Sequence, residues 1–169
     1  MKALKDYTIQ FVSLKQGTHH FEFSVNNKFF EQLDCDDFID SNFKVELEFI
    51  KQSTMMLLNF SFKGEITVPC DRCLEDLKMP IKGEDKLIVK FGDTSLNEVD
   101  DILILAESEH EINVAHYIYE FIELNIPFRR VHKEADCNAE TIKRLNELEV
   151  NKTEEIDPRW SALKNINNN

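Results

Sequence analysis

Apolar and polar residues alternate along the first third of the chain, with the period of two that is typical of half-buried strands. Aromatic, β-branched and leucine side chains occupy every second position in residues 7–11, 21–25 and 45–49. The Gln16-Gly17 pair predicts a turn that joins the first two segments into a hairpin. The acidic stretch 31–40 separates this hairpin from the following strands and is expected to hold a helical turn.

Strand patterns continue through the middle of the chain. Residues 54–69 form a long strand candidate, and one of its faces carries Met56, Leu58, Phe60 and Phe62. Gly64 is expected to mark a bulge or bend in this strand. Shorter strands and a loop follow: strands at 74–79 and 87–91 with Pro80 and Gly83 as interruptions, a loop at 97–101 and a strand at 102–105.

The apolar period becomes helical after Asn113, which is a favourable N-cap. Apolar residues recur at helical spacing through 114–124 until Pro127 ends the run, and a second helix is expected after Asn138. These patterns predict an α+β fold: an antiparallel β-sheet or partly closed β-barrel from the N-terminal two thirds, with helices in the C-terminal third. We expect residues 1–150 to form a single α+β domain and residues 151–169 to form a polar C-terminal tail.

Length and composition suit one folded domain. The chain has 169 residues, of which 42% are apolar and 13 are phenylalanine, enough for one sizeable core. We find neither an N-terminal apolar segment of signal type nor an apolar run long enough to span a membrane. A cytoplasmic location without a membrane partner is therefore expected. Four cysteines in such a chain favour metal binding or simple burial over a disulfide framework.

The charge is strongly acidic and unevenly distributed. A net charge of −12 disfavours non-specific binding to nucleic acid at long range and favours basic partners. No lysine or arginine occurs between Phe91 and Phe128. The carboxylates of this stretch form either a solvated surface or a docking site for a basic protein. The candidate docking residues are Asp93, Glu98, Asp100, Asp101, Glu107, Glu109 and Glu111.

The sequence Cys70-Asp71-Arg72-Cys73 lies between two predicted strands. Two cysteines two residues apart on a tight turn can direct both sulfurs at one metal ion, and His132 and Cys137 have the spacing of a second half-site. Together they form a candidate four-ligand zinc site. Two alternatives stay open: reduced, half-buried thiols, or a redox dithiol, although the latter needs a βαβ context and this neighbourhood resembles a β-hairpin.

Four cations lie next to these candidate ligands. Arg72 stands between the two upstream cysteines, and Arg129, Arg130 and Lys133 flank His132. If the two half-sites meet, these cations form one basic rim that can hold RNA phosphates, since screening limits repulsion from distant carboxylates to about 8 Å. The alternative is that they pair with the surrounding carboxylates. No glycine-rich phosphate loop or serine nucleophile motif occurs, so the sequence indicates no enzymatic activity.

The motifs, taken in order, resemble those of the YceD family, the large ribosomal RNA subunit accumulation proteins of bacteria and plastids. The most specific element is the Cys-x-Arg-Cys-Leu core at residues 70–74, followed by Pro127, His132 and Cys137. The resemblance covers roughly residues 44–148, and the segment 157–164 is similar to the usual family ending. Many relatives carry a further Cys-x-x-Cys-Gly segment, whereas this chain has only Cys137 there.

The resemblance implies a non-enzymatic factor that assists the synthesis, processing or stability of large-subunit (23S) ribosomal RNA. The implied partners are that RNA or its precursor and a basic large-subunit ribosomal protein. An acidic chaperone or adaptor for the ribosomal protein, without RNA contact, is the alternative. A metal site in this chain would have to include His132, because the additional cysteines are missing.

Overall fold

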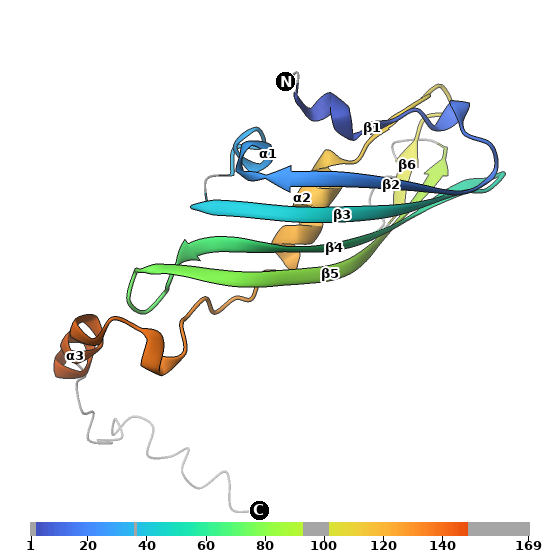
Figure 1. Ribbon diagram of the computed structural model, residues 1–169. Coiled ribbons are helices and arrows are strands. Elements are labelled where there is room, and N and C mark those ends of the chain that lie inside the picture. Colours follow the sequence, from blue (N-terminus) through green and yellow to red (C-terminus); the bar gives the residue numbers. More distant parts are fainter. Residues whose placement is uncertain (1–2, 36, 93–101, 149–169) are drawn as a thin grey trace, which may run out of the picture.

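The computed structural model describes residues 3–35, 37–92 and 102–148, and its centre is an open five-stranded sheet (Figure 1). The spatial order is β2-β3-β4-β5-β6, with antiparallel pairing except between β5 and β6, which are parallel. The strands are β2 (Gly17–Asn26), β3 (Asp40–Lys51), β4 (Met55–Pro69), β5 (Asp76–Phe91) and β6 (Ile102–Leu105). The predicted α+β class is confirmed, and the sheet is not closed into a barrel.

Helices precede and follow the central strands. The α-helices are α1 (Asn27–Glu31), α2 (Ala115–Leu124) and α3 (Ala139–Leu148), and the 3₁₀ helices are Ala3–Tyr7, Phe11–Ser13 and Glu134–Asp136. A separate two-stranded ladder joins β1 (Thr8–Ile9) to β7 (Ile112–Asn113). None of the helices in the described ranges is long and apolar enough to cross a membrane.

One face of the sheet carries the core, and α2 lies across that face (Figure 1). The period of two in the sequence places Leu47 directly opposite Phe60, and both side chains are buried. Ile118 and Ile122 of α2 are buried as well, and the ring of Phe121 packs on Phe60 at 5.2 Å between centroids. Burial of these apolar side chains is the main free-energy gain that holds α2 on the sheet.

The predicted first hairpin is wrong. The segment 7–11 contains two ends of 3₁₀ helices and the short β1, which pairs with β7 and not with β2. Tyr7 and Phe11 are buried as the alternation required, and the Tyr7 hydroxyl donates a hydrogen bond to the Ser24 carbonyl. Local alternation specifies which side chains are buried, but it does not specify the strand with which the backbone pairs. Gln16 precedes β2, and the helical turn expected within 31–40 lies earlier, in α1.

Strand β5 runs without interruption through Pro80 and Gly83, contrary to the sequence prediction. Pro80 is tolerated because this half of β5 pairs only with β4 among the described strands, so no ladder bond is lost on its other side. At Gly83, a Cβ atom would lie 2.5 Å from the Phe62 ring and 2.6 Å from the Asn125 side-chain oxygen. Glycine is required there by the close approach of these two side chains.

Gly64 of β4 does not form the expected bulge, because the register Phe43–Gly64–Ile81 continues unbroken across three strands. A Cβ atom at this position would collide with the carbonyl oxygen of Asn42 and the ring of Phe43. Replacing Gly64 with alanine should therefore lower the free energy of unfolding by about 2–3 kcal/mol, as expected for overpacking in a core. Urea denaturation measures this effect.

Gly92→Ala is the matched control for Gly64→Ala. The nearest atom to its added Cβ would be 3.5 Å away, on Ile104, which is an ordinary contact distance. Its unfolding midpoint should stay close to that of the wild type. Equal midpoints for the two variants would contradict the close packing at Gly64.

Candidate metal centre

The cysteine motif forms the turn that connects β4 to β5. The backbone N–H of Cys70 donates to the Glu75 carbonyl, and the N–H of Leu74 donates to the Cys70 carbonyl, both at 2.9 Å. These two hydrogen bonds close the turn immediately beyond the last ladder pair, Pro69–Asp76. The turn therefore continues the β4–β5 hairpin, and the predicted turn between two strands is confirmed.

The C-terminal segment that carries His132 is held against this turn by Asp71 and Arg130. The Asp71 N–H donates to the Arg130 carbonyl at 2.8 Å, and the Arg130 N–H donates to the Asp71 carboxylate at 2.7 Å. The Arg130 guanidinium lies 3.6 Å from the same carboxylate. Asp71 thereby joins two segments that are about 60 residues apart in the chain.

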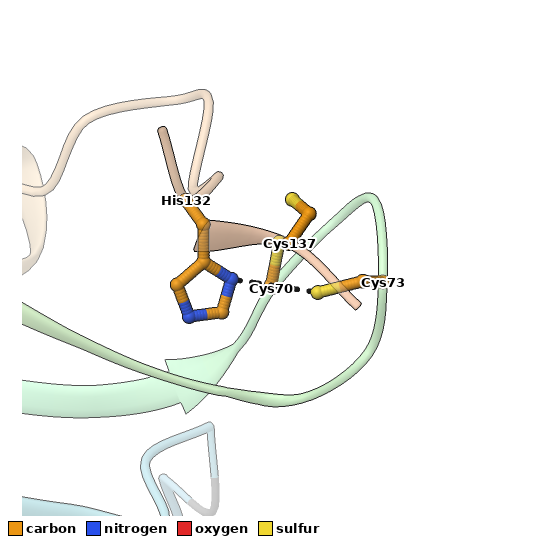
Figure 2. Close-up of side chains that lie close together, drawn as sticks. All are labelled: Cys70, Cys73, His132 and Cys137. Atoms are coloured by element: carbon orange, nitrogen blue, oxygen red, sulfur yellow. Dashed lines mark hydrogen bonds between the residues drawn. The ribbon is translucent and has the colours of Figure 1, made fainter. Parts of the chain in front are cut away.

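The four predicted metal ligands converge (Figure 2). The three Sγ atoms of Cys70, Cys73 and Cys137 and a ring nitrogen of His132 all lie within 4.8 Å of one another. The three cysteines are buried and the histidine is half-buried. In a tetrahedral zinc site, bonds of about 2.3 Å to sulfur and about 2.0 Å to nitrogen would place these two atoms about 3.6 Å apart. The distance between Cys73 Sγ and His132 Nδ1 is 3.4 Å, which fits such a site.

The imidazole of His132 is oriented for metal binding through Nδ1. Its Nε2 lies 3.2 Å from the carbonyl oxygen of Asp76. Because a carbonyl can only accept a hydrogen bond, Nε2 carries the hydrogen and the lone pair of the neutral ring is on Nδ1. Donation by the second ring nitrogen to a carbonyl is the usual outer contact of a metal-bound histidine.

Backbone groups around the turn stabilise thiolates. Burial opposes ionisation of Cys70, but hydrogen bonds from the backbone N–H groups of His132, Cys73 and Arg72 outweigh it and lower the pKa of Cys70 to about 6. Backbone hydrogen bonds from Asn138 and Glu75 likewise lower the pKa of Cys73. Since the thiolate is the form that binds a metal, these N–H groups favour two of the ligands in their binding state.

The other two ligands bind protons more firmly in the metal-free cluster. Burial, followed by the proximity of the Cys73 and Cys70 sulfurs, raises the pKa of Cys137 to about 11. Hydrogen bonds with the side chains of Cys70 and Cys73 raise the pKa of His132. A metal ion must therefore displace a proton from Cys137, and its positive charge would replace the protons that now balance the thiolates.

Asn138 follows Cys137 directly, and helix α3 begins after it, as predicted. Its side-chain oxygen accepts hydrogen bonds from the backbone N–H groups of Glu140 and Thr141 at 3.0 and 3.1 Å. Its side-chain amide donates to the Glu75 carboxylate at 2.6 Å, which ties the start of α3 to the cysteine turn. The sequence predicted the start of the helix, but it gave no signal for the contact with Glu75.

The four predicted rim cations are brought to this end of the molecule, but they differ in their contacts. Arg130 is engaged by Asp71, as described above. Arg72 is half-buried, while Arg129 and Lys133 are exposed. Within the described ranges, no ion pair involves Arg72, Arg129 or Lys133.

The remaining candidates lie elsewhere. Glu107, Glu109 and Glu111 are exposed in the connection between β6 and β7, whereas Asp93, Glu98, Asp100 and Asp101 lie outside the described residues. Cys35 is buried far along the chain from the cluster, and its thiol donates to the Glu123 carboxylate at 3.5 Å. Cys35 is thus a packed thiol with a polar partner, and it does not belong to the metal cluster.

The surroundings of the Cys70–Cys73 pair differ from those of a redox dithiol. The pair lies on a turn between two antiparallel strands, and neither cysteine begins a helix. In the thioredoxin-like arrangement, the strand-to-helix context lowers the pKa of the attacking thiol. Here the pKa of Cys70 is lowered by the backbone N–H of His132, from the C-terminal segment, and by those of Cys73 and Arg72 in the turn.

The fold and the cluster define a small α+β protein in which an open sheet carries a Cys₃His metal-binding candidate on one hairpin turn. The family model described as "Large ribosomal RNA subunit accumulation protein YceD" matches residues 58–167. The chain belongs to the YceD family, as the sequence motifs indicated. It is also similar to the uncharacterized protein YlbN of Bacillus subtilis (strain 168), with 28% identity over 119 residues and 68% of each chain covered. No solved structure matches the chain.

Proposed function

We propose that this protein is a non-enzymatic ribosome-biogenesis factor that supports the accumulation of large-subunit ribosomal RNA by binding RNA directly. The observation that carries the proposal is the convergence of the Cys₃His cluster, because its residues are flanked in the chain by the cations Arg72, Arg129 and Lys133. From here on, the name basic rim refers to these three residues alone, because the fourth predicted cation, Arg130, is engaged by Asp71. The family model is described by large-subunit ribosomal RNA, and we propose that this is the RNA that the rim binds.

The charge environment supports RNA binding at this end despite the net charge of −12. The basic rim has no ion-pair partner among the described side chains, so its cations are available for phosphate oxygens. Screening weakens repulsion by carboxylates beyond about 8 Å at physiological salt. Arg130 has a positioning role, since its contacts with Asp71 hold Arg129 and His132 beside the turn.

A structural zinc ion suits this function. Cys70, Cys73, His132 and Cys137 supply four protein ligands, which complete a tetrahedral shell and leave no open position for a reacting water. When bound, the ion would cross-link the β4–β5 turn to the segment before α3. Its role would be to hold the basic rim in one arrangement, and this agrees with a factor that has no catalytic activity.

The proposal is tested by genetic complementation. Deletion of the gene should lower the ratio of large-subunit to small-subunit ribosomal RNA, and wild-type protein should restore it. The double variant Arg72→Glu/Arg129→Glu should fail to restore the ratio, because it reverses the charge of the rim. The control Lys15→Glu/Lys28→Glu makes the same charge change at exposed positions in the N-terminal segment and should restore it. Full restoration by the rim variant would contradict direct RNA contact.

The exposed carboxylates Glu107, Glu109 and Glu111 support a second candidate, an adaptor for a basic large-subunit ribosomal protein. Capture of the bound partner from cell extract, with and without nuclease, separates the two candidates. Ribosomal protein that remains bound after RNA digestion favours the adaptor, while its loss favours RNA binding. We propose that either function is exercised in the cytoplasm.

A further inference from the structure

Three lysines stand side by side on the sheet, and the alternation of buried and exposed residues places them on the face that does not carry the core. Lys44 of β3 lies directly opposite Lys63 of β4, which in turn lies directly opposite Lys82 of β5. All three are exposed, while the neighbours Phe43, Val45, Phe62 and Ile81 along the strands are buried. We call them the lysine row; they line a hollow of about 500 Å³, with Glu46 and Glu84 along one side.

The fold itself does not explain this row. Like charges directly opposite each other on neighbouring strands are destabilising. None of the three lysines has an ion pair within 4.0 Å among the described side chains. Lysine is common on edge strands because it prevents sheet-to-sheet association, and this accounts for Lys82. Lys44 and Lys63 lie on inner strands, where that explanation does not apply.

Charges around the row differ on its two sides. Toward the cysteine turn, the next carboxylate on β4 is Glu65, and Lys78 lies 4.0 Å from it. Away from the turn, the next row of the register contains Glu22, Glu46 and Glu84. An anion on the lysine row is therefore bounded by Glu22, Glu46 and Glu84 on one side, while on the side of the metal centre the nearest carboxylate, Glu65, lies 4.0 Å from Lys78 and exposed Asp40 and Asp76 follow further along the strands.

We propose that the lysine row is a second RNA-binding surface, which contacts the phosphate backbone of the same RNA that binds the basic rim. The identity of the occupant rests on the proposed function. Lys82 is six residues from Asp76, where β5 begins, so the row lies about 20 Å from the cysteine turn on the same hairpin. The row and the exposed rows two positions away on either side carry no phenylalanine, tyrosine or tryptophan, and Phe62, which also lines the hollow, is buried. The contacts are therefore with phosphates, without base stacking.

The test measures binding of a fluorescently labelled single-stranded RNA of about 20 nucleotides over a series of salt concentrations. The variant Lys44→Gln/Lys63→Gln/Lys82→Gln should bind at least about tenfold more weakly, and the slope of log K against log salt should decrease by about two in magnitude. The same variant should unfold at a higher urea concentration than the wild type, because the like charges are removed. A variant that is more stable than the wild type but binds RNA more weakly is the result expected when residues serve ligand binding at a cost in stability.

The control Lys5→Gln/Lys15→Gln/Lys28→Gln removes the same charge from exposed positions in the N-terminal segment and should leave the salt slope unchanged. An unchanged slope in the lysine-row variant would overturn this inference, and so would a lower urea midpoint, which would assign the lysines a structural role. Sedimentation that shows a wild-type dimer abolished by the lysine-row variant would also overturn it, in favour of a second copy on this face. If the lysine-row variant loses binding but Arg72→Glu/Arg129→Glu does not, the rim proposal fails and the lysine row stands.

Discussion

Substitution of Cys73 by serine is expected to reduce the zinc content of the purified protein from about one ion per chain to near zero. Cys73 contributes one of the four converging ligand atoms, and its sulfur lies 3.4 Å from His132 Nδ1. Three remaining ligands bind zinc more weakly, because the closed tetrahedral shell is lost. Elemental analysis of protein purified without chelator measures the effect.

The same substitution should loosen the C-terminal part of the described chain. Helix α3 has no fully buried side chain, so its attachment depends on Cys137, the Asn138–Glu75 contact and partly buried residues. Limited proteolysis should therefore cleave the Cys73→Ser chain within residues 128–148 faster than the wild type. Strand β4 and helix α2 also bury Leu58, Phe60, Ile118 and Ile122 in the main apolar core, so they should stay protected.

Cys35→Ser is the matched control, since Cys35 is also a buried cysteine and lies outside the cluster. This variant should retain about one zinc ion per chain. Zinc-free wild-type protein in a folded sample would contradict the metal site. Loss of zinc in both variants would show that the measurement reports general unfolding and not ligand removal.

Zinc affinity should rise with pH. At pH 7 the thiol of Cys137, with a pKa raised to about 11, is protonated, whereas Cys70, with a pKa lowered to about 6, is largely ionised. Zinc binds the deprotonated forms, so each proton that it displaces makes the affinity increase about tenfold per pH unit. Competition with a chelator at two pH values measures the increase, and an affinity independent of pH would contradict proton displacement.

Reversing the charge of two rim residues should have the second large effect. The double variant Arg72→Glu/Arg129→Glu is expected to bind single-stranded RNA about 100-fold more weakly than the wild type. A hydrogen bond to a charged group contributes about 1.5 kcal/mol, and this corresponds to roughly tenfold in affinity for each residue. Fluorescence anisotropy at physiological salt measures the change. The fold should be preserved, because neither side chain has an ion-pair partner among the described residues.

Two comparisons show whether this loss is specific. Lys15→Glu/Lys28→Glu changes the net charge equally and should weaken RNA binding only slightly, since long-range repulsion is screened. Arg130→Glu places a carboxylate beside Asp71, so it should disturb the turn and reduce zinc retention as well as RNA affinity. If the rim variant binds RNA as the wild type does, direct contact through Arg72 and Arg129 is wrong.

The central strands follow from the sequence because their cause is local. One face of β3 and β4 is buried, so apolar side chains must recur with a period of two, and Leu47, Leu58 and Phe60 show it plainly. The beginnings of α2 and α3 are also local, since Asn113 and Asn138 accept hydrogen bonds from backbone N–H groups two or three residues ahead. Such signals need no knowledge of the remaining chain.

Failures of sequence prediction occur where a distant partner decides the structure. Residues 7–11 alternate like a strand, but their backbone pairs with β7, more than a hundred residues away. Gly64 looks like a bulge, yet it is needed because the carbonyl of Asn42 and the ring of Phe43 occupy the space of a side chain. Pro80 looks like a strand breaker, yet it is accepted because its position in the sheet leaves one side of the strand unpaired among the described residues.

The metal centre depends both on local sequence signals and on contacts between distant parts of the chain. The residue types and spacings of Cys70, Cys73, His132 and Cys137 were sufficient to select them as candidate ligands, because the coordination chemistry of zinc restricts which side chains qualify. Their convergence within 4.8 Å, the Nδ1 lone pair of the histidine and the partner of Arg130 depend on contacts across some 60 residues of chain. The lysine row is likewise invisible in the sequence, since only the strand register places three separate lysines side by side. Residue composition and hydrophobic periodicity can be read from consecutive residues of the sequence. Strand register and long-range contacts, by contrast, are decided only when the chain folds and buries its apolar faces.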